Sequence, residues 1–130
     1  MNYSDLTAVA LDLRSGNSDE LKKYNDSELI DMHKEVAKSI MLLDLQVALN
    51  IDINDSETVD KVVNRYTDRL QKALAYKQLC FFYQELNGSE GSKADVRFKN
   101  YVSLYNSIKS TFSQMKSDVI TPTTSKSVWL

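Results

Sequence analysis

One stretch of the sequence carries the ligand types of a calcium-binding loop. In "DINDSETVD", side-chain oxygens alternate along the chain as they do in such loops, at Asp52, Asn54, Ser56, Thr58 and Asp60. Glu57 stands where the loop needs a glycine, and Val63 stands where a bidentate glutamate closes the cage. A helix N-cap at Asn54, with Glu57 three residues later, explains the same residues more simply. We therefore expect no metal site.

The residue types that most often act as nucleophile and base occur once each. Cys80 lies in the aromatic-rich run "LAYKQLCFFYQEL", where apolar surroundings raise the pKa of a thiol and make it unreactive. His33 is near Asp31 and Glu35, but residues two apart on a helix point in different directions, so we expect a surface histidine. The sequence has no phosphate-binding glycine loop, paired-carboxylate motif or zinc spacing. We expect the protein not to be an enzyme and to use no cofactor.

A third candidate site is a row of basic residues at helical spacing: Lys61, Arg65, Arg69, Lys72 and Lys77. Such a row fits a phosphate backbone, but the net charge is −2 and no recognition-helix pattern precedes the row. Residues 1–60 hold 13 Asp+Glu against 5 Lys+Arg, whereas residues 61–130 hold 5 against 11. Either these charges neutralise one another within the monomer, or the two flanks associate head to tail. In the second case, the inter-subunit charge contacts are Lys61, Arg65, Arg69 and Lys72.

The elements that must position these residues are helical. The hydrophobic pattern predicts an all-α fold, a bundle of three long helices plus a short N-terminal helical segment capped by Ser4. The long helices are expected within 25–50, from Asn54 to Leu86, and from Ser92 to Val119. Only three glycines and one proline occur, which argues against an all-β fold. We expect a helical domain over residues 1–119 and an extended C-terminal arm over 120–130.

Two apolar stripes run along the first long helix. One comprises Leu29, Met32, Val36, Ile40, Leu43 and Val47, and the other comprises Ile30, Ala37, Met41, Leu45 and Leu49. A helix this widely apolar is expected to be covered on two sides, by its own domain and by a neighbour. The other two long helices should form an antiparallel hairpin, with Tyr66, Leu70, Leu74 and Phe81 facing Tyr101, Tyr105, Ile108 and Phe112.

The chain ends in "VITPTTSKSVWL" and has its single tryptophan one residue from the end. A terminus normally carries small polar residues, so this tail is expected to bind something. The candidate partner-binding residues are Ile120, Pro122, Val128, Trp129 and Leu130. Two interpretations stay open, docking onto another subunit and packing onto the chain's own helices.

Composition narrows the class of protein further. The 130 residues suit one domain, and 42% of them are hydrophobic. There is no apolar run of the roughly 18 residues that a membrane span needs, and the N-terminal residues do not read as a signal peptide. A single cysteine fits a reducing compartment.

The run "LQKALAYKQLCFFYQELNGSEGSKADVRFKNYVSLYNSIKSTFSQMKSDV" resembles the C-terminal helical hairpin of tailed-bacteriophage head–tail connector (adaptor or neck) proteins. The shared features are an Ala/Tyr-rich helix ending in an aromatic cluster, a short polar loop, a Tyr-containing helix with a late Phe, and a tail. The resemblance implies a virion structural protein at the head–tail interface, made in the host cytoplasm. The resemblance also implies a ring, commonly twelvefold, that binds the portal protein and a tail or second neck protein and passes DNA non-specifically. The alternative is a small cytoplasmic helical adaptor or regulator that binds one protein partner.

Overall fold

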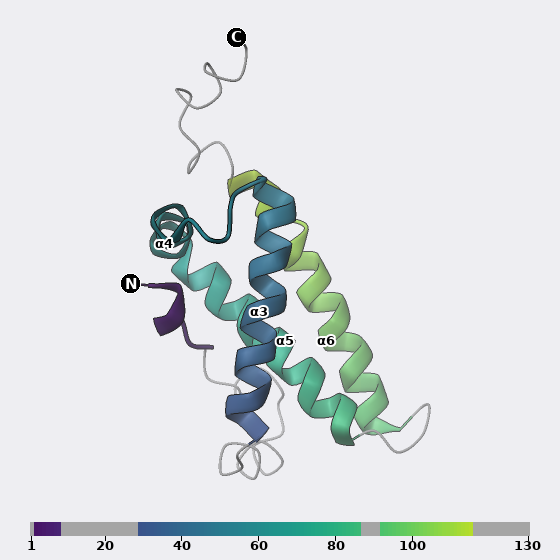
Figure 1. Cartoon of the computed structure of the whole chain (residues 1–130). Coiled ribbons are helices and arrows are strands. Elements are labelled where there is room, and N and C mark those ends of the chain that lie inside the picture. The colour runs from purple at the N-terminus through teal and green to yellow at the C-terminus, as the bar shows by residue number, and fades with distance from the viewer. Residues whose placement is uncertain (1, 9–28, 87–91, 116–130) are drawn as a thin grey trace.

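The computed structural model describes residues 2–8, 29–86 and 92–115. In these residues the regular backbone is helical and forms no strand, which confirms the predicted all-α fold. The helices are α3 (Leu29–Leu49), α4 (Ser56–Arg65), α5 (Thr67–Leu86) and α6 (Lys93–Lys109), with 3-10 turns at Tyr3–Asp5 and Phe112–Met115. Figure 1 shows that α3 lies across the pair formed by α5 and α6, while α4 is set at an angle near one end. The three long helices are α3, α5 and α6.

The first long helix ends where the sequence predicts. Asn50 follows α3 with a φ of 54°, a left-handed conformation that asparagine tolerates better than most residues. Its backbone N–H donates to the carbonyl oxygen of Gln46 at 2.8 Å, which satisfies one of the last carbonyls of the helix. Beyond the turn, Ile51 is buried in the core, so the chain reverses and leads into α4.

The expected single helix from Asn54 to Leu86 is wrong, because the structure contains two helices, α4 and α5, that meet at Tyr66. Tyr66 has φ −123° and ψ 34°, outside helical geometry. Next to it, the amide of Asn64 donates to the carbonyl of Asp60 at 2.7 Å, and the hydroxyl of Thr67 donates to the carbonyl of Val63 at 2.6 Å. Side-chain donors of this kind compete with the helical backbone and bend helices.

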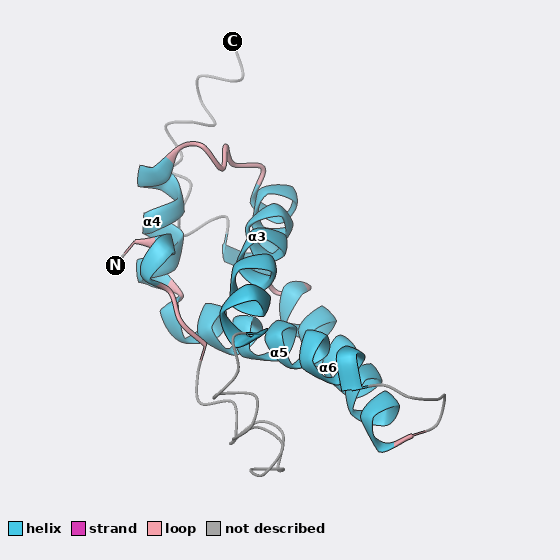
Figure 2. Cartoon of the chain, turned by 60° about the horizontal axis from the view of Figure 1, so that its bottom comes forward, coloured by secondary structure: helices cyan, strands magenta, loops and turns pink. Residues whose placement is uncertain are grey.

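The hairpin of α5 and α6 is antiparallel, as predicted, and both views show the two helices side by side (Figures 1 and 2). Ser92 caps α6, since its hydroxyl oxygen accepts from the backbone N–H of Asp95 at 3.1 Å. The helix does not continue to Val119 as expected but ends at Lys109. The hydroxyl of Ser110 donates to the carbonyl of Ser107 at 2.6 Å, so local hydroxyl bonds again accompany the end of a helix.

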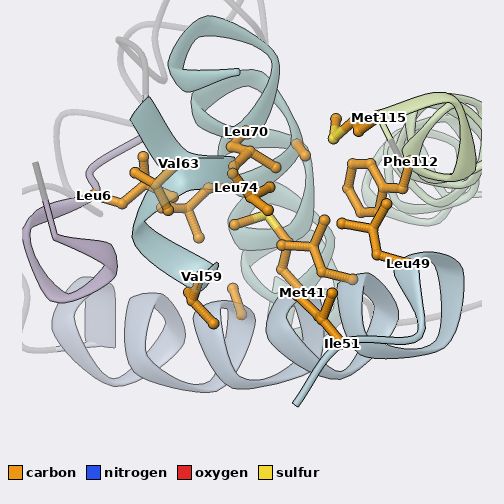
Figure 3. Close-up of a cluster of buried hydrophobic side chains, with 14 of the residues drawn as sticks. Leu6, Met41, Leu49, Ile51, Val59, Val63, Leu70, Leu74, Phe112 and Met115 are labelled. Carbon is orange, nitrogen blue, oxygen red and sulfur yellow. The ribbon is translucent and has the colours of Figure 1, made fainter. Parts of the chain in front are cut away.

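One hydrophobic core joins all these elements. Figure 3 shows side chains from distant parts of the chain converging, among them Leu6, Met41, Val63 and Phe112. The core residues with less than a tenth of their surface exposed include Leu6, Met41, Leu45, Leu49, Val59, Val62, Val63, Leu70, Leu74, Tyr105, Phe112 and Met115. The break at Tyr66 and the turn after α6 are what bring the α4 valines and Phe112 into it.

The predicted facing of the hairpin residues is confirmed in its main part. Leu70, Leu74, Tyr105 and Phe112 share the core, and Tyr66, Phe81 and Ile108 pack against it. Tyr101 instead belongs to a second cluster near the loop end of the hairpin, where its ring stacks on Tyr83 at a centroid distance of 5.9 Å.

The N-terminal segment differs from the predicted helix capped by Ser4. It makes a 3-10 turn at Tyr3–Asp5, after which Leu6 is extended and fully buried. The backbone N–H of Tyr3 donates to Asp60 at 3.1 Å, and the ammonium of Lys38 donates to the carbonyl of Ser4 at 2.8 Å. These long-range bonds, together with the bond from the Tyr3 hydroxyl to the carbonyl of Lys38, hold the segment between α3 and α4. Residues 9–13 of the expected helix lie outside the described residues.

Candidate functional site

Three of the four predicted charge-contact residues lie together around an open hollow at the junction of α4 and α5. We call this surface the basic hollow. It has a volume of about 570 Å³ and is lined by Asn64, Arg65, Tyr66, Thr67, Asp68, Arg69, Lys72, Ile108 and Thr111. The fourth predicted residue, Lys61, is exposed on α4 but does not line the hollow, so its role in a charge contact stays a prediction.

The break at Tyr66 creates the basic hollow. Arg65 ends α4, and Arg69 and Lys72 lie on the first turns of α5, while the end of α6 supplies the opposite wall. The guanidinium of Arg69 donates to the hydroxyl of Thr111 at 3.5 Å and lies 5.4 Å from the centroid of the Tyr66 ring. These two contacts orient the side chain of Arg69. The side chains of Arg65 and Lys72 are exposed to solvent.

The basic hollow carries an excess of positive charge. Asp68 is the one carboxylate among its lining residues, against two arginines and a lysine. Within the residues that the structure describes, none of these three cations forms an ion pair. Arginine in such a setting suits bidentate binding of carboxylate or phosphate groups. The hollow is therefore able to receive an acidic group from another molecule.

Lys77, the last member of the predicted basic row, has a different role. Its ammonium lies 4.7 Å from the ring centroid of Tyr105 and 5.8 Å from that of Phe81. Contacts of this kind stabilise the packing of the helices, so Lys77 belongs to the structure of the hairpin rather than to the basic hollow.

A second surface is the exposed side of α3, which we call the outer face. Its eight exposed residues are Leu29, Asp31, Met32, Glu35, Val36, Ser39, Leu43 and Val47. Val47 is 84% exposed, Met32 53% and Leu43 52%, which is unusual for side chains of this kind on one helix. Contiguous exposed apolar surface of this type marks interaction sites.

The two predicted stripes of α3 thus have different environments. The stripe with Met41, Leu45 and Leu49 is buried in the core, and the stripe with Leu43 and Val47 forms the outer face. Since α3 packs on the core through the buried stripe, its outer face points away from the core. No residue of α3 lines the basic hollow, so the two surfaces are separate.

His33 is not the surface histidine that the sequence suggested. It is 5% exposed, its Nε2 lies 2.8 Å from a carboxylate oxygen of Glu85, and its ring centroid is 5.8 Å from that of Phe81. His33 therefore joins α3 to the end of α5. The signal for burial was present, because His33 precedes Ala37, Met41, Leu45 and Leu49 at a constant spacing of four.

Cys80 lies in the apolar environment that the sequence indicates. It is buried beside Leu79, Phe82 and Tyr83, and burial raises the pKa of its thiol to about 11. At neutral pH the group is a protonated thiol, which is a poor nucleophile.

The calcium-like loop is used to start a helix. The N-cap of α4 is Asp55 rather than the predicted Asn54, and its carboxylate accepts from the hydroxyl of Thr58 at 2.8 Å and from its backbone N–H at 3.3 Å. These bonds lower the pKa of Asp55. Asp52 accepts from the backbone N–H of Asn54 at 2.9 Å. Among the described residues, no three His, Cys, Asp or Glu side chains are placed to hold a metal ion.

The predicted arm residues, Ile120, Pro122, Val128, Trp129 and Leu130, lie outside the described residues. The sequence did not indicate that Tyr66, Ile108 and Thr111 line a site, since no local pattern links the end of α6 to the α4–α5 junction.

In the described part of the chain, no helix is both long and apolar enough to cross a bilayer. Comparisons with models of known protein families, with curated proteins and with solved structures give no match.

Proposed function

We propose that the chain is a structural subunit that assembles head to tail, and that the assembly is a head–tail connector ring joining a phage portal to a tail. One observation carries the proposal, namely that a single small domain has two separate and unlike surfaces suited to protein contacts. The outer face of α3 is apolar with acidic residues, and the basic hollow is cationic. A contact between unlike surfaces uses one surface of each copy and leaves the other free, so further copies can add and close a ring when the rotation allows.

The described residues also favour binding over catalysis. The single cysteine and the single histidine are both buried, on different helices, and His33 is engaged with Glu85. The cationic residues that are exposed form a surface open enough for a protein segment rather than an enclosed pocket for a small substrate. The connector role itself rests on the resemblance of the α5–α6 hairpin region to that family. In the assembled ring, the arm from Ile120 to Leu130 would dock on the portal, and the ring would line the passage for DNA.

The proposal is tested by mixing the chain with the portal protein encoded in the same genome and imaging the product by electron microscopy. The expected result is a ring of the chain seated on the portal. Deletion of residues 121–130 should abolish docking while leaving the melting temperature of the isolated chain unchanged. A large drop in melting temperature would assign the arm to the chain's own core instead.

The charge contact is tested by reversing Arg65 and Arg69 to glutamate. We expect assembly to weaken, with the strongest defect at low salt, where surface charges act over about 30 Å. Normal assembly of the reversed variant in low salt would contradict the contact. A genome without a portal gene, together with a one-to-one complex with another protein, would favour the small helical adaptor.

A further inference from the structure

We infer that the outer face of α3 in one copy docks over the basic hollow of the next copy, with Asp31 and Glu35 facing Arg65, Arg69 and Lys72. This inference deepens the proposed head-to-tail assembly and rests on it. It names which surface of each subunit meets which surface of its neighbour.

Charge complementarity is the first support. Within α3, every residue of which the structure describes, the exposed charged side chains are Asp31 and Glu35, both acidic, whereas Lys34 and Asp44 are half-buried. The basic hollow presents three cations that form no ion pair among the described residues. Asp31 and Glu35 lie one helical turn apart, about 6 Å along the axis, and Arg69 and Lys72 are also separated by about one turn. The two rows of opposite charge therefore have similar spacing.

The apolar surface fits the same arrangement. Met32 and Val36 lie next to the two carboxylates on the outer face and are 53% and 44% exposed. On the other side, Tyr66 and Ile108 are half-buried and contribute apolar surface to the lining of the hollow. Covering apolar surface around a charge pair removes water from it, which strengthens the attraction between the charges.

A symmetric contact between two α3 helices fits less well. The only fully exposed charged residues of α3 are Asp31 and Glu35, and Lys34 is half-buried, so such a contact would bring four carboxylates of two copies to one interface with few cations to offset them. Like charges brought together in this way oppose association. The basic hollow supplies two arginines and a lysine against one carboxylate, an excess of cations that a second α3 does not offer.

The test uses two single charge reversals, Glu35→Arg on the outer face and Arg65→Glu in the hollow. Both residues are exposed, so neither reversal disturbs the core. Lys61→Glu is the matched control, since it makes the same change on the same helix as Arg65 but outside the hollow. Self-association of the full chain is measured by sedimentation velocity over a range of concentrations at low ionic strength, and folding of each variant is checked by circular dichroism.

We expect each single reversal to weaken self-association at least about tenfold. An equimolar mixture of the two reversed chains should associate again, because the unaltered outer face of one chain meets the unaltered hollow of the other, and the two reversed surfaces also complement each other. The double variant Glu35→Arg/Arg65→Glu should also associate, and Lys61→Glu should behave as wild type.

Four results would overturn the pairing. If wild type associates and the single reversals associate equally well, the contact lies elsewhere, although the proposed ring still stands. If both reversals fail and the mixture does not recover, the two residues do not face each other. If wild-type chains neither associate nor form a ring on a portal, the inference and the proposed function fail together. In an α3–α3 dimer, Glu35→Arg would change self-association in either direction. Arg65→Glu would leave self-association unchanged and would not restore it in the mixture.

Discussion

The hydrogen bond between Tyr105 and Asp44 is the best place to test the packing of α6 against α3. Tyr105 is 1% exposed, and its hydroxyl donates to the Asp44 carboxylate at 2.6 Å. Burial, together with this bond, raises the pKa of the phenol, so the neutral donor is the form present in the folded protein. We consider the variants Tyr105→Phe, Asp44→Ala and the two combined.

The size of each effect follows from where the two groups lie. A hydrogen bond to a charged group contributes about 1.5–3 kcal/mol. In Tyr105→Phe the carboxylate of Asp44 remains next to an open hollow that Lys109 also lines, so water can replace the hydroxyl. We therefore expect Tyr105→Phe to lower the free energy of unfolding by about 1.5 kcal/mol, near the lower limit. In Asp44→Ala the buried hydroxyl loses its acceptor, and we expect a loss of about 2–3 kcal/mol.

The double variant removes both the hydroxyl and the carboxylate, so neither is left behind without its partner. Its loss of unfolding free energy should therefore be smaller than the sum of the two single losses. The expected coupling energy is about 1–1.5 kcal/mol. It is measured by urea denaturation followed by circular dichroism. The free energy of unfolding must fall with urea concentration at the same slope in all variants. Asp31→Ala, which removes an exposed carboxylate from the same helix, is the control and should cost less than about 0.5 kcal/mol. A coupling energy below about 0.5 kcal/mol would show that the bond does not hold α6 to α3 in solution.

Two neighbouring leucines of α3 should separate folding from assembly. Leu45→Ala, at a position 1% exposed, should destabilise the monomer by about 2–5 kcal/mol, whereas Leu43→Ala, at a position 52% exposed, should leave urea stability nearly unchanged and weaken self-association. Equal effects of both on monomer stability would show that the outer face is packed within the monomer. The thiol of Cys80 should react with iodoacetamide at pH 8 far more slowly in the folded chain than in urea, because its folded pKa is about 11. The same raised pKa means that the unfolded thiol ionises before the folded one, so this group lowers the free energy of unfolding by about 1.4 kcal/mol per pH unit from pH 9 to 11. The raised pKa of Tyr105 acts in the same direction, so Cys80→Ala should reduce the slope rather than abolish it. Rapid labelling of the folded chain would contradict burial of the thiol.

Local sequence patterns determined much of the architecture. The three-four spacing on α3, the cap at Ser92 and the two stripes of the α5–α6 hairpin are properties of short segments, so they could be identified without knowing what the segments pack against. The apolar environment of Cys80 was predictable for the same reason, since its neighbours in sequence on the same helix supply much of it.

Positions that depend on distant contacts were not predictable in the same way. Both apolar stripes of α3 satisfy the helical period, and only packing against α4, α5 and the end of α6 decides that Leu45 is buried and Leu43 is exposed. The spacing of four places His33 on the buried stripe, but only the tertiary structure supplies its polar partner, Glu85, from 52 residues away.

The break between α4 and α5 has the largest consequence for the proposed function. Residues 54–86 keep the apolar spacing of a helix throughout, so the sequence by itself predicts one helix. The bend at Tyr66 lets Val59, Val62 and Val63 of α4 share one core with Leu70 and Leu74 of α5. The sequence thus determined the basic residues and their helical spacing. Only the tertiary structure brought Arg65, Arg69 and Lys72 to the end of α6, because the walls of the basic hollow come from segments about 40 residues apart that long-range packing alone places together.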